Sequence, residues 1–218
     1  GREIGERLMT KNVPDGLFVA FEGVEGSGKT TQSEALARAL SEAGYHVSLA
    51  IEPGGTPTGE LVRQWVKSGT DITPLSELFL FSAARAALVE SVIAPAMDQG
   101  GVVVCDRYIY STVAYQGYGR GLDLKTIADL NHTATGGLSP RLVVLLDMPA
   151  DQSAGRKGST ELDRIERESQ SFHRRVRDGY LEQARLDPER WLVLDATGPI
   201  DDIGRAVWAR VSSMLPSS

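Results

Sequence analysis

The sequence predicts a doubly wound α/β fold, in which helices cover both faces of a parallel sheet. Two observations support this: short apolar runs of strand length recur along the chain, and stretches with helical periodicity separate them. Strands that alternate with helices form parallel sheets, because each helix carries the chain back to the edge where the previous strand began. We expect five strands, at Leu17–Glu22, Val47–Ile51, Val102–Asp106, Leu142–Asp147 and Trp191–Asp195.

Helix signals occupy the intervals between these strands. In the stretch TTQSEALARALSEAG, apolar residues share one face, and Gly44 fits the position after a helix end. Thr73 and Pro74 fit the N-cap and the first position of a long helix that reaches about Met97. We expect further helices at 59–67, 124–132, 162–184 and 200–215.

Length and composition limit the classes of protein to consider. The 218 residues suit one well-buried domain, which we place at 17–218, after a frayed extension at 1–16. A net charge of -6 argues against a broad surface for nucleic acid or for anionic membranes. No window approaches the apolar length that spans a bilayer, and the single cysteine, Cys105, fits a reducing compartment. We therefore expect a cytoplasmic protein.

The turn between the first strand and the first helix matches the phosphate-binding pattern G-x-x-x-x-G-K-[ST]. Its letters are GVEGSGKT, at 23–30. Glycines let backbone N–H groups turn inward around an anion, Lys29 reaches the β and γ phosphates, and Thr30 can bind Mg²⁺. We expect a nucleoside triphosphate to be held by this P-loop, whose residues are Gly23, Val24, Glu25, Gly26, Ser27, Gly28, Lys29, Thr30 and Thr31.

A triphosphate site alone leaves switch GTPases, motor-like ATPases, metabolic kinases and ATP-dependent ligases open. DQGG at 98–101 fits the GTPase pattern D-x-x-G by letters, but it follows a helix and precedes a strand, and no N-K-x-D motif appears. Ligands of doubly wound sheets bind at the carboxyl ends of the strands. There the sequence places four acidic residues: Glu22, Glu52, Asp106 and Asp147.

Four stretches of the chain form a narrow combination. They are FEGVEGSGKTTQ at 21–32, EPGGT at 52–56, DRYIYSTVAYQG at 106–117 and ELDRIERES at 161–169. Together they resemble the thymidylate kinase (dTMP kinase) family of P-loop nucleoside monophosphate kinases. The resemblance implies a three-layer P-loop NTPase fold with a five-stranded parallel sheet and a short lid. It also implies a homodimeric enzyme that transfers the γ-phosphate of Mg-ATP to dTMP in dTTP biosynthesis.

The same resemblance implies roles for the residues that follow the third strand. Arg107 would clamp the phosphates of donor and acceptor, and Asp106 would hold Mg²⁺ together with Thr30. Together with Lys29, Arg107 and Asp106 are the expected catalytic residues of this part of the site. We expect Tyr108 and Tyr110 to pack, and we expect the acceptor nucleoside to be lined by Ser111, Thr112, Tyr115 and Gln116.

Phe81 and Arg85 stand four residues apart in FSAAR, so they share one helix face. By the resemblance they would stack on thymine and bond its O4. Glu25 would meet the 3′-hydroxyl of the sugar, and Arg63 would lie near the acceptor phosphate. Glu52 is equally well explained as a cap of the EPGGT turn.

A lid is expected at about 154–161, with the letters AGRKGSTE. Relatives whose P-loop lacks a basic residue at its variable positions supply arginines from the lid instead. We choose Arg156 as the catalytic lid residue, because its planar fork can bind two phosphate oxygens. Two other cations remain candidates, Lys157 and Arg164, and for the second an ion pair is the competing role, with Asp163 or Glu166.

Two alternatives remain beside a dTMP kinase that uses ATP and Mg²⁺. A deoxynucleoside kinase would share the P-loop and the strand-end Asp-Arg pair but would accept an uncharged nucleoside. A nonenzymatic P-loop regulator would bind nucleotide without turnover.

Overall fold

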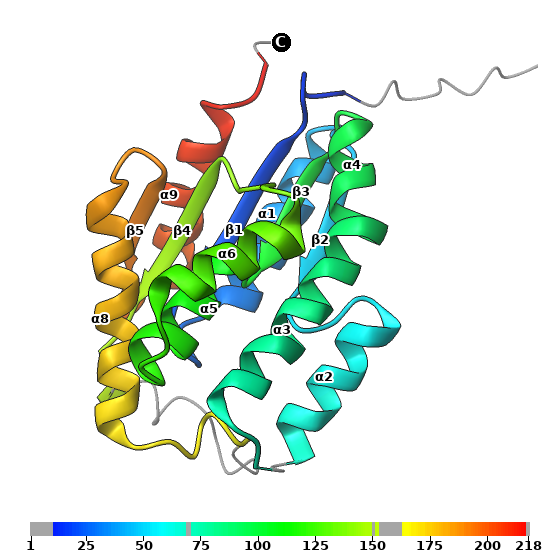
Figure 1. Cartoon of the computed structure of the whole chain (residues 1–218). Coiled ribbons are helices and arrows are strands. Elements are labelled where there is room, and N and C mark those ends of the chain that lie inside the picture. The colour runs from blue at the N-terminus through cyan, green and yellow to red at the C-terminus, as the bar shows by residue number, and fades with distance from the viewer. Residues whose placement is uncertain (1–10, 69–70, 150, 153–162, 217–218) are drawn as a thin grey trace, which may run out of the picture.

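A five-stranded, fully parallel sheet forms the centre of the protein (Figure 1). The computed structural model describes residues 11–68, 71–149, 151–152 and 163–216. The strands run in the spatial order β2-β3-β1-β4-β5, and their bounds confirm the five expected runs. They are β1 (Leu17–Glu22), β2 (Val47–Ile51), β3 (Val102–Asp106), β4 (Leu142–Asp147) and β5 (Trp191–Asp195).

Helices cover both faces of the sheet (Figure 1). Alternate residues of β1 belong to different cores: Val19 and Phe21 share one cluster with residues of the helices at 29–42 and 200–212, whereas Phe18 and Ala20 share another with residues of the helical stretch at 74–98. This alternation follows from the strand period of two and confirms the doubly wound class. The helical elements are α1 (Lys29–Glu42), α2 (Pro57–Ser68), α3 (Pro74–Leu88), η1 (Val89–Ile93), α4 (Ala94–Asp98), α5 (Ile109–Thr112), η2 (Val113–Gly119), α6 (Leu124–Thr135), α8 (Gln170–Leu186) and α9 (Ile200–Ser212).

Local hydrogen bonds explain where the helix bounds differ from the expected ones. The helix expected from residue 162 begins at Gln170, where Ser169 caps α8 by accepting the N–H of Phe172. Before it, Asp163 accepts the N–H groups of Ile165 and Glu166 and so folds a turn instead of a helix. α9 ends at Ser212 rather than at residue 215, and α6 continues to Thr135 rather than stopping at 132.

The long helix expected from Thr73 begins as predicted but is not regular. The Thr73 hydroxyl accepts the N–H of Ser76, and Pro74 opens the helix. A π-helical turn, η1, then separates α3 from α4. Pro95 lies just after this turn and has no N–H to donate, which favours such an irregular turn in the helix before it.

The stretch Pro74–Asp98 also corrects the expectation about apolar windows. It is 25 residues long and contains an 18-residue window with a mean hydropathy of 1.5, so it is long and apolar enough to cross a membrane by length and composition. In the fold it lies against the sheet and buries Leu88 and Ile93 in the core. It also carries two buried ionisable side chains, Glu77 and Arg85, which have partners inside the protein. The buried core helix of a folded domain can be as long and as apolar as a helix that crosses a membrane.

Residues 11–16 pack against the rest of the domain, although we expected 1–16 to be a frayed extension. Val13 is buried, and its N–H donates to the carbonyl of Gly100. Lys11 forms a parallel bridge with Tyr45. These contacts tie 11–16 to the amino edge of the sheet, while 1–10 lie outside the described residues.

Close packing of α8 against η2 gives the first prediction. A Cβ built on Gly179 would lie 2.6 Å from Cγ of Tyr118, so Gly179→Ala should lower the free energy of unfolding by about 1–3 kcal/mol. The matched control is Gly204→Ala in α9, where the nearest atom is the side-chain oxygen of Gln32 at 3.3 Å. Urea denaturation should show the control to be neutral or up to about 1 kcal/mol more stable. Equal effects of the two variants would contradict this packing.

Candidate active site

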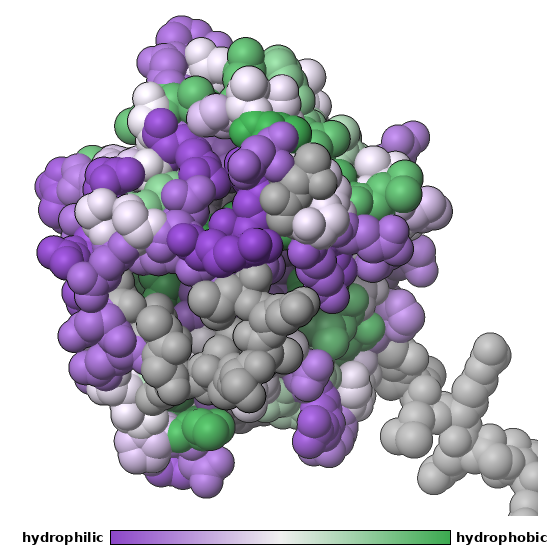
Figure 2. Space-filling model, turned by 90° about the horizontal axis from the view of Figure 1, so that it is seen from below, coloured by the Kyte–Doolittle hydropathy of each residue, from purple (hydrophilic) through white to green (hydrophobic). Residues whose placement is uncertain are grey.

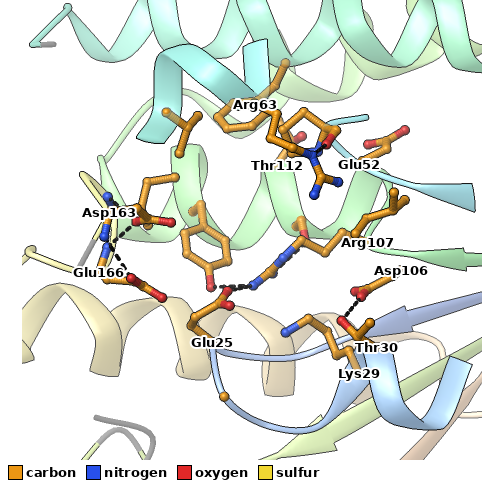
Figure 3. Close-up of a pocket in the computed structure, with 18 of the residues that line it drawn as sticks. Glu25, Lys29, Thr30, Glu52, Arg63, Asp106, Arg107, Thr112, Asp163 and Glu166 are labelled. Atoms are coloured by element: carbon orange, nitrogen blue, oxygen red, sulfur yellow. Dashed lines mark hydrogen bonds and ion pairs between the residues drawn. The ribbon is translucent and has the colours of Figure 1, made fainter. Parts of the chain in front are cut away.

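A cavity of about 490 Å³ opens at the carboxyl ends of the central strands (Figure 3). Figure 2 views this end of the molecule, and much of the surface there is formed by hydrophilic residues. The structure brings most of the expected site residues into the cavity lining: Glu25, Gly26, Gly28, Lys29, Thr30, Thr31, Arg63, Phe81, Arg85, Asp106, Arg107, Ser111, Thr112, Tyr115 and Gln116. Gly23, Val24 and Ser27 lie in the loop behind this lining, and Arg156 lies outside the described residues together with the expected lid.

The P-loop connects β1 to the start of α1 by a tight backbone turn that depends on glycine. Gly23 has a φ of 141°, and a Cβ there would lie 2.5 Å from the carbonyl oxygen of Leu146. Only glycine fits so close to β4. The buried Ser27 hydroxyl has no hydrogen-bond partner within the described part of the chain, so it is suited to bind a ligand oxygen at the cradle.

Lys29 extends along this loop, and its Nζ donates to the carbonyl of Val24 at 2.8 Å. Burial, and then the charge of Arg107, lower the pKa of Lys29 from 10.5 to about 8. The ammonium is therefore poorly neutralised by the protein, which favours its binding to an anion such as phosphate.

Thr30, in the first turn of α1, contacts Asp106 at the end of β3. The Thr30 hydroxyl donates to Oδ2 of Asp106 at 2.6 Å (Figure 3). A hydroxyl and a carboxylate beside a phosphate loop are oxygen ligands of the kind Mg²⁺ prefers, and Mg²⁺ takes its remaining ligands from water and phosphate. Residues 11–68, 71–149, 151–152 and 163–216 contain no group of three or more acidic, His or Cys side chains that could enclose a metal ion. The two side chains fit a magnesium ion that is held jointly with a nucleotide.

Arg107 stands in a left-handed backbone conformation, with a φ of 71°. For a residue with a side chain, this costs roughly 1–2 kcal/mol, and such strain concentrates at functional sites. Its Nη2 donates to Oε2 of Glu25 at 2.7 Å, and its Nη1 donates to the carbonyl of Gly23 at 3.1 Å. The guanidinium lies 5.2 Å from the ring of Tyr115. Arg107 thus joins the P-loop to the polar wall that follows β3.

Arg85 is almost fully buried and is gripped by Glu52. Its Nε and Nη2 donate to the Glu52 carboxylate at 2.9 and 2.7 Å, its Nη1 donates to Asn131 at 2.7 Å, and its Nη2 also donates to Thr112 at 2.8 Å. Burial raises the pKa of Glu52 to about 7, against the opposing charge of Arg85. One N–H of Nη1 has no acceptor among the residues that the structure describes. A ligand carbonyl could accept from this N–H.

Glu52 therefore does not cap the EPGGT turn. The carboxylate that serves the turn is that of Glu60, whose Oε1 accepts the N–H of Gly55. Arg63 donates to the carbonyl of Pro53 at 2.8 Å and lines the cavity. The sequence could not distinguish these two glutamates, because the partner of Glu52 is 33 residues away.

Glu77 is a second buried carboxylate behind the cavity wall. It accepts the side-chain amide of Gln116 at 2.7 Å and the guanidinium of Arg120 at 3.2 Å. Burial alone would raise the pKa of Glu77, but the hydrogen bonds from Arg120 and Gln116 outweigh it, so the pKa lies below its usual value. Arg164 also pairs with Glu77, and with Asp71 at 3.4 Å. Arg164 thus has the ion-pair role that was the alternative to phosphate contact, but its partners are Glu77 and Asp71 rather than Asp163 or Glu166.

Several cavity or wall residues were missed from sequence. Tyr180, buried in α8, bonds Arg107 and Ser111 by its hydroxyl, and its place on an apolar helix face gave no signal of a polar role. Asp163, Glu166 and His173 also line the cavity. Tyr108 packs against Phe18, and Cys105 is buried in the core, as expected.

Comparison with known proteins identifies the family. The Thymidylate kinase family model matches residues 21–207. The chain belongs to the thymidylate kinase family. A thymidylate kinase of Deinococcus radiodurans is 49% identical over 201 residues, which cover 90% of this chain and 97% of that protein. A thymidylate kinase of Thermomicrobium roseum is 47% identical over 200 residues, with 91% and 95% covered.

A solved structure supports the same assignment. The crystal structure of thymidylate kinase from Ehrlichia chaffeensis matches with a TM-score of 0.76 at 36% identity, and the match covers 91% of this chain and 99% of that one. These findings confirm the P-loop α/β fold and the resemblance drawn from the four motifs. The protein is accordingly a phosphotransferase.

The Glu52–Arg85 pair gives the second prediction. Glu52→Gln keeps the shape of the side chain but leaves a buried guanidinium without its counter-charge, so the free energy of unfolding should fall by about 3 kcal/mol at pH 8. The control is Glu60→Gln, where the exposed pair with Arg63 at 3.9 Å should contribute no more than about 1 kcal/mol. Urea denaturation measures both. A loss below 1 kcal/mol for Glu52→Gln would show that Arg85 does not depend on this partner.

Proposed function

We propose that the protein transfers the γ-phosphate of ATP to dTMP, giving dTDP and ADP in the synthesis of dTTP. One observation carries this proposal: Arg107 contacts the P-loop at Gly23 and the acceptor wall at Ser111 with the same guanidinium. A cation in that position can touch both the phosphate that leaves ATP and the phosphate that receives it. Phosphoryl transfer needs positioning and positive charge more than a strong base.

The donor side is assigned to the P-loop. Its backbone and Lys29 would hold the β and γ phosphates of ATP, while Thr30 and Asp106 would hold Mg²⁺ and its waters. When bound, Mg²⁺ neutralises charge on the transferring phosphate. We assign Arg156 of the lid as a further cation at the γ-phosphate, in keeping with its position in the sequence.

The acceptor side is assigned to the wall formed by α3, α5 and η2. Phe81 would stack on thymine, and the remaining N–H of Arg85 would donate to its O4. Arg63 would approach the phosphate of dTMP, and Glu25 the 3′-hydroxyl. The sugar and base would be enclosed by Ser111, Thr112, Tyr115 and Gln116.

The wider setting follows from the same family assignment. We propose a homodimer in the cytoplasm that works without a nucleic acid or membrane partner. The exposed side chains of Leu75 and Phe79 on α3, with 46% and 52% of their surface accessible, support a partner for that helix face. The net charge of -6 is consistent with small anionic substrates that are held only by local cations.

The third prediction is the reaction itself. Purified protein with Mg-ATP should convert dTMP to dTDP, and ion-exchange chromatography of the products measures this. A methyl group contributes only about 1–3 kcal/mol to recognition, so dUMP should be a poorer substrate, whereas dCMP should fail because its 4-amino group faces an Arg85 donor. Turnover of thymidine without turnover of dTMP would favour a deoxynucleoside kinase. Nucleotide binding without any turnover would favour a regulator.

The fourth prediction concerns pH and Lys29. Because its pKa is lowered to about 8, the charged form that binds phosphate is present below pH 8 and is lost above it. The value of kcat/KM for ATP should therefore fall about tenfold per pH unit above pH 8. Lys29→Arg keeps its charge throughout this range. It should be less active but lack that fall, and an identical alkaline limb in both proteins would assign the titration to another group.

A further inference from the structure

Glu22, at the end of β1, has no exposed surface and does not line the cavity, yet it is surrounded by donors. Its Oε1 accepts the backbone N–H groups of Tyr108 at 2.9 Å and Ser111 at 3.2 Å. Its Oε2 accepts the hydroxyls of Ser111 at 2.6 Å and Tyr180 at 3.0 Å. All four donors belong to the segment after β3 or to α8.

The two hydroxyls bound to Glu22 also contact Arg107. Nη1 of Arg107 donates to the Ser111 hydroxyl at 3.2 Å and to the Tyr180 hydroxyl at 3.3 Å. A hydroxyl that donates its only proton to a carboxylate turns its lone pairs away from that carboxylate. The Ser111 proton goes to Glu22, and the Tyr180 proton goes either to Glu22 or to the Ser111 oxygen 2.8 Å away. In both arrangements the two oxygens accept from the guanidinium of Arg107.

The same carboxylate secures the strained backbone at Arg107. The N–H of Arg107 donates to the carbonyl of Phe21, and the next N–H, of Tyr108, donates to Glu22. Both acceptors belong to the end of β1. A residue with a φ of 71° keeps that conformation only where its surroundings fix it.

A competing contact makes this support necessary. Glu25 accepts from the other terminal nitrogen of Arg107 at 2.7 Å and is 40% exposed. Without the two hydroxyls, Nη1 would keep the carbonyl of Gly23, which belongs to the same loop as Glu25, so the guanidinium could follow Glu25 toward the mouth of the cavity. Tyr180 is 1% exposed and, like Glu22, does not line the cavity, so neither side chain can touch a substrate directly.

We propose that Glu22 and Tyr180 are positioning residues, which hold the guanidinium of Arg107 over the phosphate-transfer site through the hydroxyl pair of Ser111 and Tyr180. The inference rests on the proposed function, in which Arg107 contacts the transferring phosphate. It assigns a catalytic contribution to two residues that lie behind the cavity wall.

A double-mutant cycle tests the proposal. Tyr180→Phe removes the hydroxyl but keeps the ring, which packs against Tyr115 with centroids 6.3 Å apart. It should lower kcat for dTMP about tenfold, the effect of weakening one hydrogen bond to a charged group. The same change is then made in an Arg107→Ala protein, whose slow reaction is measured as a single turnover with enzyme in excess. There Tyr180→Phe should change the rate by less than about twofold, because the guanidinium that Tyr180 positions is absent. Glu22→Gln provides a second, independent cycle.

The control is Tyr110→Phe, which deletes a phenolic hydroxyl whose bond is to Arg190, away from Arg107. It should leave kcat unchanged. If Tyr180→Phe costs the same factor with and without Arg107, or if Tyr180→Phe is as active as Tyr110→Phe, the positioning role is refuted. If the Tyr180 variant is unstable in thermal unfolding, the Glu22→Gln cycle decides by the same criterion. A wild-type protein that does not phosphorylate dTMP would instead refute the proposed function.

Discussion

The parallel pairing of β1 with β3 is the constraint on which the site depends. Phe21 of β1 lies in register with Asp106 of β3, so the loops that follow the two strands leave the sheet at the same point. One loop is the P-loop and the other carries Arg107. The bond between Thr30 and Asp106, at 2.6 Å, closes this junction. Residues that are 76 positions apart thereby form one surface for phosphate and metal.

Three buried carboxylates hold the wall of the cavity from behind. Glu22 binds the hydroxyls that face Arg107, Glu52 grips Arg85, and Glu77 holds the amide of Gln116. Burying such charges is costly and adds little net stability compared with an apolar core. Fixed donors and acceptors, however, need no reorganisation when charge moves in the reaction. The energetic cost is therefore consistent with a site built for orientation rather than for stability.

The sequence was sufficient for the features that depend on local pattern. The five strands occur at their expected bounds, and Thr73 and Pro74 open α3 as predicted, because runs of apolar residues and capping signals act over a few positions. Features that depend on distant contacts were not predictable. The Tyr180 hydroxyl contacts Ser111 and Glu22, which lie 69 and 158 positions earlier in the chain, and Arg164 pairs with Glu77, 87 positions earlier. The start of α8 was misplaced for another reason, since a side-chain turn at Asp163 overrides the helical pattern.

A crystal structure with dTMP, Mg²⁺ and a non-hydrolysable ATP analogue would show whether Arg107 joins the two substrates. The Arg107 guanidinium should contact both the γ-phosphate group and the phosphate of dTMP, while its Nη1 still donates to the hydroxyls of Ser111 and Tyr180. Thymine should lie on Phe81, with its O4 at Arg85. A dTMP phosphate bound beyond the reach of Arg107, or an Arg107 that has turned away with Glu25, would contradict it.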